Sequence, residues 1–235
     1  CKKVPKPRHV RFVPMNRCEP WRCTYVDAEG TIDATWAEKN GVDLDLVYVV
    51  GNRWGEECLE TVEDHTLSQD ADLIIIGKRG EAADFAKLHL GSNLERVVRS
   101  SHRPVLVAAR AFKPISRFLI AFDGGTSAMK AVDHVARSLL FAGLECHLLT
   151  AGADTPEARK RLEDAAILLR AAGYTVQTDI EAGAADAAIA KRVEADGIDL
   201  LVMGAYGHSR IRSLIIGSTT TEMIRSCMIP VLLFR

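Results

Sequence analysis

Several features that would direct the search for a function are missing from the 235-residue chain. No charge of one sign dominates, since 30 basic residues stand against 31 acidic ones. This balance gives no support to a nucleic-acid partner or to binding at an acidic membrane surface. No apolar run approaches the roughly 20 residues that cross a bilayer, and no secretory apolar segment follows the basic start CKKVPKPRH. The composition predicts a soluble, cytoplasmic protein with neither kind of partner.

Paired cysteines are also lacking. Four residues separate Cys18 from Cys23, but no matching second pair exists, so the spacing argues against zinc. Cys146 falls in an expected strand and Cys227 in an expected helix, where a reduced thiol behaves as a small apolar residue. We take all six cysteines as reduced cytoplasmic thiols and assign no metal ligand to the chain.

The most informative pattern that is present begins at Leu200. The apolar run Leu200 to Met203 is too short for a helix and predicts a buried strand. A glycine string follows, and a helical pattern begins where it ends. Glycine lets the backbone approach a bulky anion closely, and unpaired amides at a helix start attract phosphate, with neighbouring hydroxyls in support. The expected phosphate-binding residues are Gly204, Gly207, Gly217, Ser218 and Thr219.

Three glycines alone would equally fit a loop built for turn geometry. The complete string G-x2-G-x9-G-S, lying between a buried strand and a helix and closing on a strand at 229–234, resembles the ATP-binding signature of the universal stress protein family. The resemblance covers strand, loop, helix and strand without a gap. It implies an adenine-nucleotide site that binds ATP, with Mg²⁺ bridging the phosphates.

The chain also contains an internal repeat. Gly77 and Gly80 lie 127 positions before Gly204 and Gly207, and similar strand patterns flank both pairs. We interpret this as a tandem duplication. The expected domains are a degenerate N-terminal copy at 1–112 and a C-terminal nucleotide-binding copy at 113–235, both resembling the universal stress protein family.

The second copy alternates strands with helices, which predicts an α/β fold with a parallel sheet and helices on both faces. The resemblance implies two tandem open five-stranded sheets of the adenine-nucleotide α-hydrolase type, with strand order 3-2-1-4-5. The strands are expected at 117–122, 144–150, 174–180, 198–203 and 231–234. The helices are expected after Thr126 or Ser127 as a cap, from Pro156 to Gly173, at 184–195 and after Gly217.

Strand order 3-2-1-4-5 places the end of the first strand beside that of the fourth, so Asp123 is expected to meet the Gly204 loop. In the resembled family an acid at this position contacts adenine, and the residue after strand two, here Ala151, adds backbone contacts. An Asp before two glycines is also a common turn residue, and that alternative stays open. His208 and Arg210 lie in the nine-residue loop and are expected to neutralise phosphate charge.

The first copy is less regular. Residues 10–13 are taken as a candidate first strand and 44–50 as the second, while residues 14–40 match no family element. Because no acid ends a recognisable first strand, we predict one nucleotide per chain, held by the second copy. The first copy is expected to be structural and to pair internally with the second through strands 105–107 and 231–233, which leaves a homodimer open.

The predicted function is that of a nucleotide-dependent sensor or regulator in a stress response. No pair of carboxylates, general base or nucleophile is placed for hydrolysis, so we assign no catalytic residue and expect slow turnover at most. One alternative is an adenylating enzyme of the related fold, although Asp123 stands where its pyrophosphate loop would have a small hydroxyl residue. Another is a nucleotide-free interaction scaffold.

Overall fold

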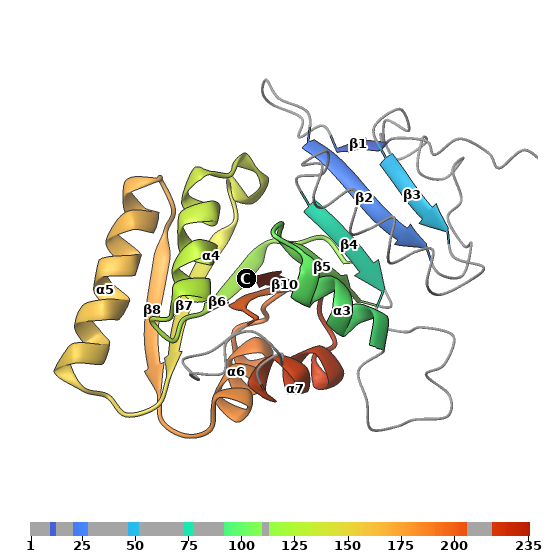
Figure 1. The fold of residues 1–235 in the computed structure, drawn as a ribbon. Helices are drawn as coiled ribbons and strands as arrows, with labels where there is room; N and C mark the ends of the chain where they lie inside the picture. The colour runs from blue at the N-terminus through green and yellow to red at the C-terminus, as the bar shows by residue number, and fades with distance from the viewer. Residues whose placement is uncertain are drawn as a thin grey trace, which may run out of the picture. The chain divides into compact units, whose positions relative to one another are not determined.

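The computed structural model describes residues 10–12, 21–27, 47–51, 73–77, 92–109, 113–205 and 218–235. The chain divides into two compact units, Cys1–Leu106 and Val107–Arg235, and each is described by itself (Figure 1). Within the described ranges, no helix has the length and apolar character needed to cross a membrane.

The sheet of the first unit is built around a central strand, β2 (Trp21–Asp27). β4 (Leu73–Gly77) pairs with it in parallel, from Cys23 opposite Leu73 to Val26 opposite Ile76. β3 (Val47–Gly51) also runs parallel to β2 and pairs at Asp27. β1 (Val10–Phe12) lies antiparallel to the start of β2.

This arrangement corrects the sequence interpretation of the first copy. The candidate first strand at residues 10–13 is found as β1, but it runs antiparallel to β2 and so is not the first strand of the parallel sheet. Residues 14–40, which matched no expected element, contain β2, and β2 holds the place between β3 and β4. The expected second strand at 44–50 is found as β3.

One helix and one further strand complete the described part of the first unit. α3 (Ser92–Ser100) buries Leu94, Val97 and Val98, which recur at the spacing of one helix face. The three isoleucines of β4 are buried as well. β5 (Val105–Ala108) begins beside β4, where the Ile74 amide donates to the Pro104 carbonyl at 3.0 Å.

Between residues 117 and 234 of the second unit, the described strands pair in parallel. β9 (Leu200–Gly204) lies between β10 (Val231–Phe234) and β6 (Arg117–Ala121). β6 pairs on its other side with β7 (Glu145–Ala151), which pairs with β8 (Val176–Glu181). The spatial order of this sheet is therefore β8, β7, β6, β9, β10, and the chain changes direction across the sheet between β6 and β9.

Helices lie on both faces of this sheet (Figure 1). α4 (Thr126–Arg137) and α5 (Pro156–Ala171) pack against each other and the sheet, whereas α6 (Ala185–Ala195) packs against β7 and α7 (Ser218–Ser226). Because crossovers between parallel strands are right-handed, the reversal of direction between β6 and β9 places α6 and α7 on the face opposite to α4 and α5. The α/β fold with a mostly parallel sheet is thus as expected.

The core of the second unit forms around Phe118 on β6. Its ring lies 5.1 Å from that of Phe141, in the short 3₁₀ turn Leu139–Phe141, and 6.0 Å edge-on from Tyr174. The Tyr174 hydroxyl lies 3.0 Å from the Val135 carbonyl and 3.2 Å from that of Ser138, and it donates to this pair of acceptors. The aromatic cluster therefore fixes the end of α4 against the sheet, and burial of each of the two phenylalanine rings is worth about 1.5–3 kcal/mol.

Candidate functional site

Strand register brings the expected base-binding residues to one edge of the second sheet. Ala121 stands opposite Leu149 on one side and Met203 on the other. Asp123, Ala151 and Ala205 each lie two residues beyond that row, at the carboxyl ends of β6, β7 and β9. Ligands of open parallel sheets bind at this edge, where the strand order changes direction. The structure therefore brings Asp123 and Ala151 to the same edge as Gly204.

Asp123 forms a tight turn with the residues that follow it. Its Oδ1 accepts a hydrogen bond of 2.7 Å from the Gly125 amide. A Cβ at Gly125 would lie only 2.9 Å from that same oxygen, so this position must be glycine for the carboxylate to stay where it is. The turn role that the sequence left open is therefore present, and it fixes the carboxylate at the edge of the sheet.

The same turn corrects the expected start of α4. Neither Thr126 nor Ser127 caps the helix. The N-cap is Gly125, with no side-chain hydrogen bond to the first helical amides. The physical reason is that the Asp123 carboxylate satisfies the Gly125 amide, so the chain turns one residue earlier and Ser127 enters the first helical turn, where it is buried.

Gly204 has a packing role that its sequence pattern did not reveal. A Cβ at this position would lie 2.8 Å from Ser127 Cβ and 3.1 Å from the Ala128 amide nitrogen. Real Cβ atoms do not approach neighbours so closely, so only glycine lets β9 end against the first turn of α4. In the described structure the close approach at Gly204 is therefore to protein, and it packs the end of β9 against the first turn of α4.

The helix that carries the two hydroxyl residues begins as expected. Ser218 is the first residue of α7 and Thr219 the second. Thr220, which the sequence reading passed over, is buried and its hydroxyl lies 3.2 Å from the Gly204 carbonyl, to which it donates. A threonine directly after the Ser-Thr pair was the available signal, and its contact ties the start of α7 to the end of β9.

Four expected site residues lie outside the described residues: Gly207, His208, Arg210 and Gly217. Their phosphate-binding role stays a prediction. Among the residues that are described, no group of three or more His, Cys, Asp or Glu side chains is arranged to hold a metal ion.

The first copy has an acid near the corresponding edge. Val26 of β2 pairs with Ile76 as Ala121 of β6 pairs with Met203. Asp27 follows Val26 directly, so it lies one residue beyond this paired position. Asp123 lies two residues beyond the corresponding position, Ala121, in the second copy. The sequence interpretation found no acid ending a first strand because it did not recognise β2 as a strand.

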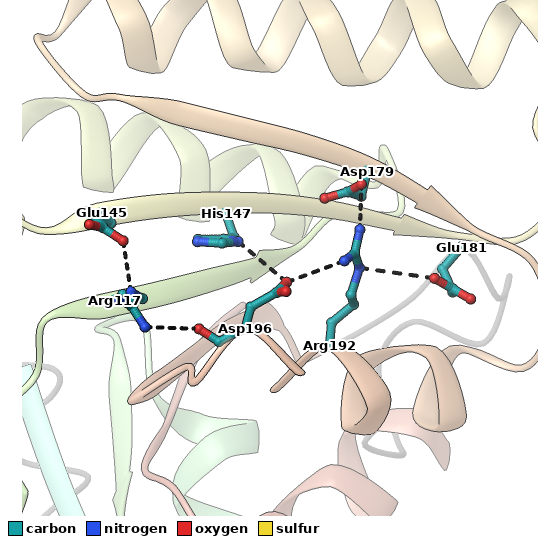
Figure 2. Close-up of polar contacts among 7 residues, drawn as sticks. All are labelled: Arg117, Glu145, His147, Asp179, Glu181, Arg192 and Asp196. Atoms are coloured by element: carbon teal, nitrogen blue, oxygen red, sulfur yellow. Dashed lines mark hydrogen bonds and ion pairs between the residues drawn. The ribbon is translucent and has the colours of Figure 1, made fainter. Parts of the chain in front are cut away.

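A second polar cluster lies on the α6 face of the second sheet (Figure 2). Arg192 of α6 forms ion pairs with Asp179, Glu181 and Asp196. His147 is buried on β7 with its Nδ1 3.5 Å from Asp196 Oδ2. The pairs join α6 to β7 and β8, and we interpret the cluster as a structural clamp.

Lys191 extends the same clamp at the solvent side. Its Nζ donates a hydrogen bond of 2.5 Å to Glu181 Oε1, and this bond, helped by the charges of Lys191 and Arg192, lowers the pKa of the Glu181 carboxyl. Such a carboxylate stays ionised at neutral pH, so it serves as an ion-pair partner and is a poor general acid.

Comparison with known proteins identifies the family of this fold. The model of the universal stress protein family matches residues 37–109 and 148–235. The chain therefore belongs to the universal stress protein family. The two matched segments fall one in each half of the chain, around the two copies of the glycine pattern.

Among curated relatives, the chain is 45% identical over 179 residues to universal stress protein Slr1230 of Synechocystis, which covers 75% of this chain and 62% of that protein. It is 30% identical over 81 residues to universal stress protein MJ0577 of Methanocaldococcus jannaschii, covering 34% of this chain and 50% of that one. The matches thus span 62% and 50% of the lengths of these two relatives.

Two solved structures match most of the chain. A universal stress protein from Archaeoglobus fulgidus aligns with a TM-score of 0.64 at 26% identity, over 86% of this chain and 74% of that one. A universal stress protein from Pseudomonas aeruginosa aligns with a TM-score of 0.63 at 16% identity, over 91% and 93%. At 16% identity, the similarity to the Pseudomonas aeruginosa structure supports the fold alone.

Proposed function

We propose that this chain binds one ATP in its C-terminal copy, residues 113–235, and acts as a nucleotide-dependent regulator of a cytoplasmic stress response. The observation that carries the proposal is the meeting of three strand ends at one sheet edge, together with the hydroxyl residues that begin α7. Asp123, Ala151 and Gly204 lie at one sheet edge, and α7 starts with Ser218 and Thr219. The first copy, residues 1–112, is proposed as a structural partner.

In this proposal the site has two ends. Asp123 and the backbone at Ala151 contact the adenine at the ends of β6 and β7. The phosphates lie at the helix start, where free amides and the helix dipole favour negative charge. The residues assigned to the phosphates are Gly204, Gly207, His208, Arg210, Gly217, Ser218 and Thr219. Mg²⁺ would accompany the phosphates and neutralise part of their charge, as it commonly does in nucleotide sites.

The proposal includes the tandem organisation. Two sheets of order 3-2-1-4-5 would pair internally through residues 105–107 and 231–233, and a homodimer would extend that pairing. The two matched family segments support two copies. Binding, with slow turnover at most, is the proposed activity, because the sequence indicates no general base or nucleophile placed for hydrolysis.

The geometry after β6 disfavours the adenylating enzyme. A pyrophosphate loop at this position needs backbone amides directed at the anion. Here the Gly125 amide donates to the Asp123 carboxylate, which also carries a negative charge of its own. A pyrophosphate at this turn would lose a donor and meet a like charge, so ATP is proposed to bind with its phosphates at α7 instead.

Calorimetric titration of the full chain with Mg-ATP tests the proposal. The informative variant is Gly125→Ala, because its Cβ would displace the Asp123 carboxylate. We expect wild type to bind one ATP and Gly125→Ala to bind at least about tenfold more weakly, a loss of about 1.4 kcal/mol.

Gly77→Ala is the matched control, since a Cβ there meets no described atom within 4 Å. It should bind ATP as wild type does. An absence of heat with wild type at millimolar Mg-ATP would contradict the proposal, and release of pyrophosphate from ATP would support the adenylating enzyme instead.

A further inference from the structure

Arg161 lies against the loop that carries Asp123, although it comes from a different element. It belongs to α5, which packs against α4, and its side chain is exposed. A Cβ at Gly124 would lie 3.3 Å from Arg161 Cδ, 3.5 Å from Nε and 3.8 Å from Cζ. The charged end of the side chain, and not only its methylene stem, therefore covers the backbone of Gly124.

Backbone conformation explains why position 124 is glycine. Its φ of +75° lies in the left-handed region that favours glycine. An added Cβ would be tight only against Arg161 Cδ and in ordinary contact with Nε and Cζ. The turn after β6 therefore lies directly against the side chain of a cation from α5.

The charge of Arg161 is not matched within the described part of the chain. Five other arginines of the second unit form ion pairs there, and Arg161 has none. The paired arginines and their acids are Arg117 with Glu145, Arg137 with Asp133, Arg159 with Asp154, Arg170 with Glu163, and Arg192 with Asp179. An exposed arginine that pairs with no acid has its planar face and donors available for a ligand.

We propose that Arg161 is a ligand-binding residue of the nucleotide site and that its guanidinium contacts the base. This inference rests on the proposed function, which places the adenine beside Asp123 and the phosphates at α7. A guanidinium stacks on aromatic rings and donates to ring nitrogens, and both contacts depend on the base rather than on the phosphates. Arg161 therefore adds to the affinity for adenosine and for ATP by the same factor.

The test uses the full chain and displacement of a fluorescent ATP analogue by three probes: Mg-ATP, adenosine and inorganic tripolyphosphate. In Arg161→Ala we expect the affinities for Mg-ATP and adenosine to fall together, by about five- to tenfold, as the loss of one such contact gives. The affinity for tripolyphosphate should stay within twofold of wild type. Arg161→Lys should recover only part of the loss, because an ammonium is not planar.

Arg159→Ala is the matched control, since Arg159 is an exposed arginine on the same helix that pairs with Asp154. It should leave all three affinities unchanged. Equal binding of ATP by wild type and Arg161→Ala would overturn the inference alone, and so would a loss confined to ATP and tripolyphosphate. A wild-type chain that binds neither ATP nor adenosine would overturn the proposed function and this inference with it.

Discussion

Gly204 ends β9 directly against Ser127 in the first turn of α4, where an added Cβ would lie 2.8 Å from the Ser127 Cβ. The contact joins the strand that precedes the proposed phosphate-binding residues to the helix that follows the Asp123 turn. The Thr220 hydroxyl of α7 donates a hydrogen bond of 3.2 Å to the Gly204 carbonyl. The distance between the proposed base and phosphate ends is therefore set by packing within the protein.

Gly204→Ala should lower the free energy of unfolding by about 1–3 kcal/mol, because the new methyl group forces α4 and β9 apart. Urea unfolding followed by circular dichroism measures the change. Gly77→Ala, the repeat-equivalent substitution in the first unit, should cost less than 0.5 kcal/mol, roughly the size of a surface change, since its Cβ meets no described atom within 4 Å. Equal losses in the two variants would show that the close contact at Ser127 does not constrain position 204.

Arg192→Ala should destabilise the second unit by about 1–3 kcal/mol, because Asp179 and Asp196 would lose a partly buried cation. Arg137→Ala provides the control, as Arg137 pairs with Asp133 on an exposed helix face and should cost less than about 0.5 kcal/mol. Thermal unfolding of both variants compares them. A similar midpoint for the two would contradict the clamp interpretation.

Acid should weaken the clamp through Glu181. Its pKa is lowered in the folded protein below the ordinary value of 4.5, chiefly by the hydrogen bond from Lys191. Its contribution to stability is therefore fully present above that ordinary pKa and is lost as the pH falls through the folded-state pKa. In Glu181→Gln the unfolding free energy should depend less on pH below 4.5 than in wild type, as measured by urea titration at stepped pH. Identical slopes would exclude Glu181 as a source of the acid sensitivity.

High pH should lower the free energy of unfolding through ionisation of Cys146. Burial raises the pKa of its thiol from 9.0 to about 12. The unfolded chain then ionises first, so stability from this group is present below pH 9 and falls by up to about 1.4 kcal/mol per pH unit between 9 and 12. Cys146→Ala should remove that part of the alkaline slope while Cys227→Ala keeps it. A wild-type thiol at position 146 that alkylates rapidly at pH 8 in the folded protein would contradict its burial.

The second copy was predictable from sequence to within a few residues because each element carries a local signal. Short apolar runs predicted β6 and β9, and Pro156 after Thr155 predicted the start of α5, where the Thr155 side chain accepts from the Ala158 amide. The first copy was not predictable in the same way. β2 has Arg22 and Thr24 within it, so its pattern did not read as a buried strand, and the apolar residues of β1 drew attention to the wrong segment.

The site was predictable as a set of positions but not as a set of roles. Gly204 was assigned to close ligand approach, whereas its missing Cβ also accommodates Ser127. Arg161 gave no signal, because an exposed arginine on an amphipathic helix is normally a solvated charge. Its contact with Gly124 joins residues 37 positions apart and follows only from the packing of α5 on α4. Local patterns identify loops, but contacts between elements decide what each loop residue does.

The central claim is that the C-terminal copy holds one nucleotide per chain. The most direct measurement is to denature the purified protein, identify released nucleotide by chromatography and count it per chain, for wild type, Gly207→Val and Gly80→Val. We predict about one adenine nucleotide from wild type and from Gly80→Val, and none from Gly207→Val. Absence of nucleotide from all three, with no uptake after addition of Mg-ATP, would contradict the claim and favour a nucleotide-free scaffold.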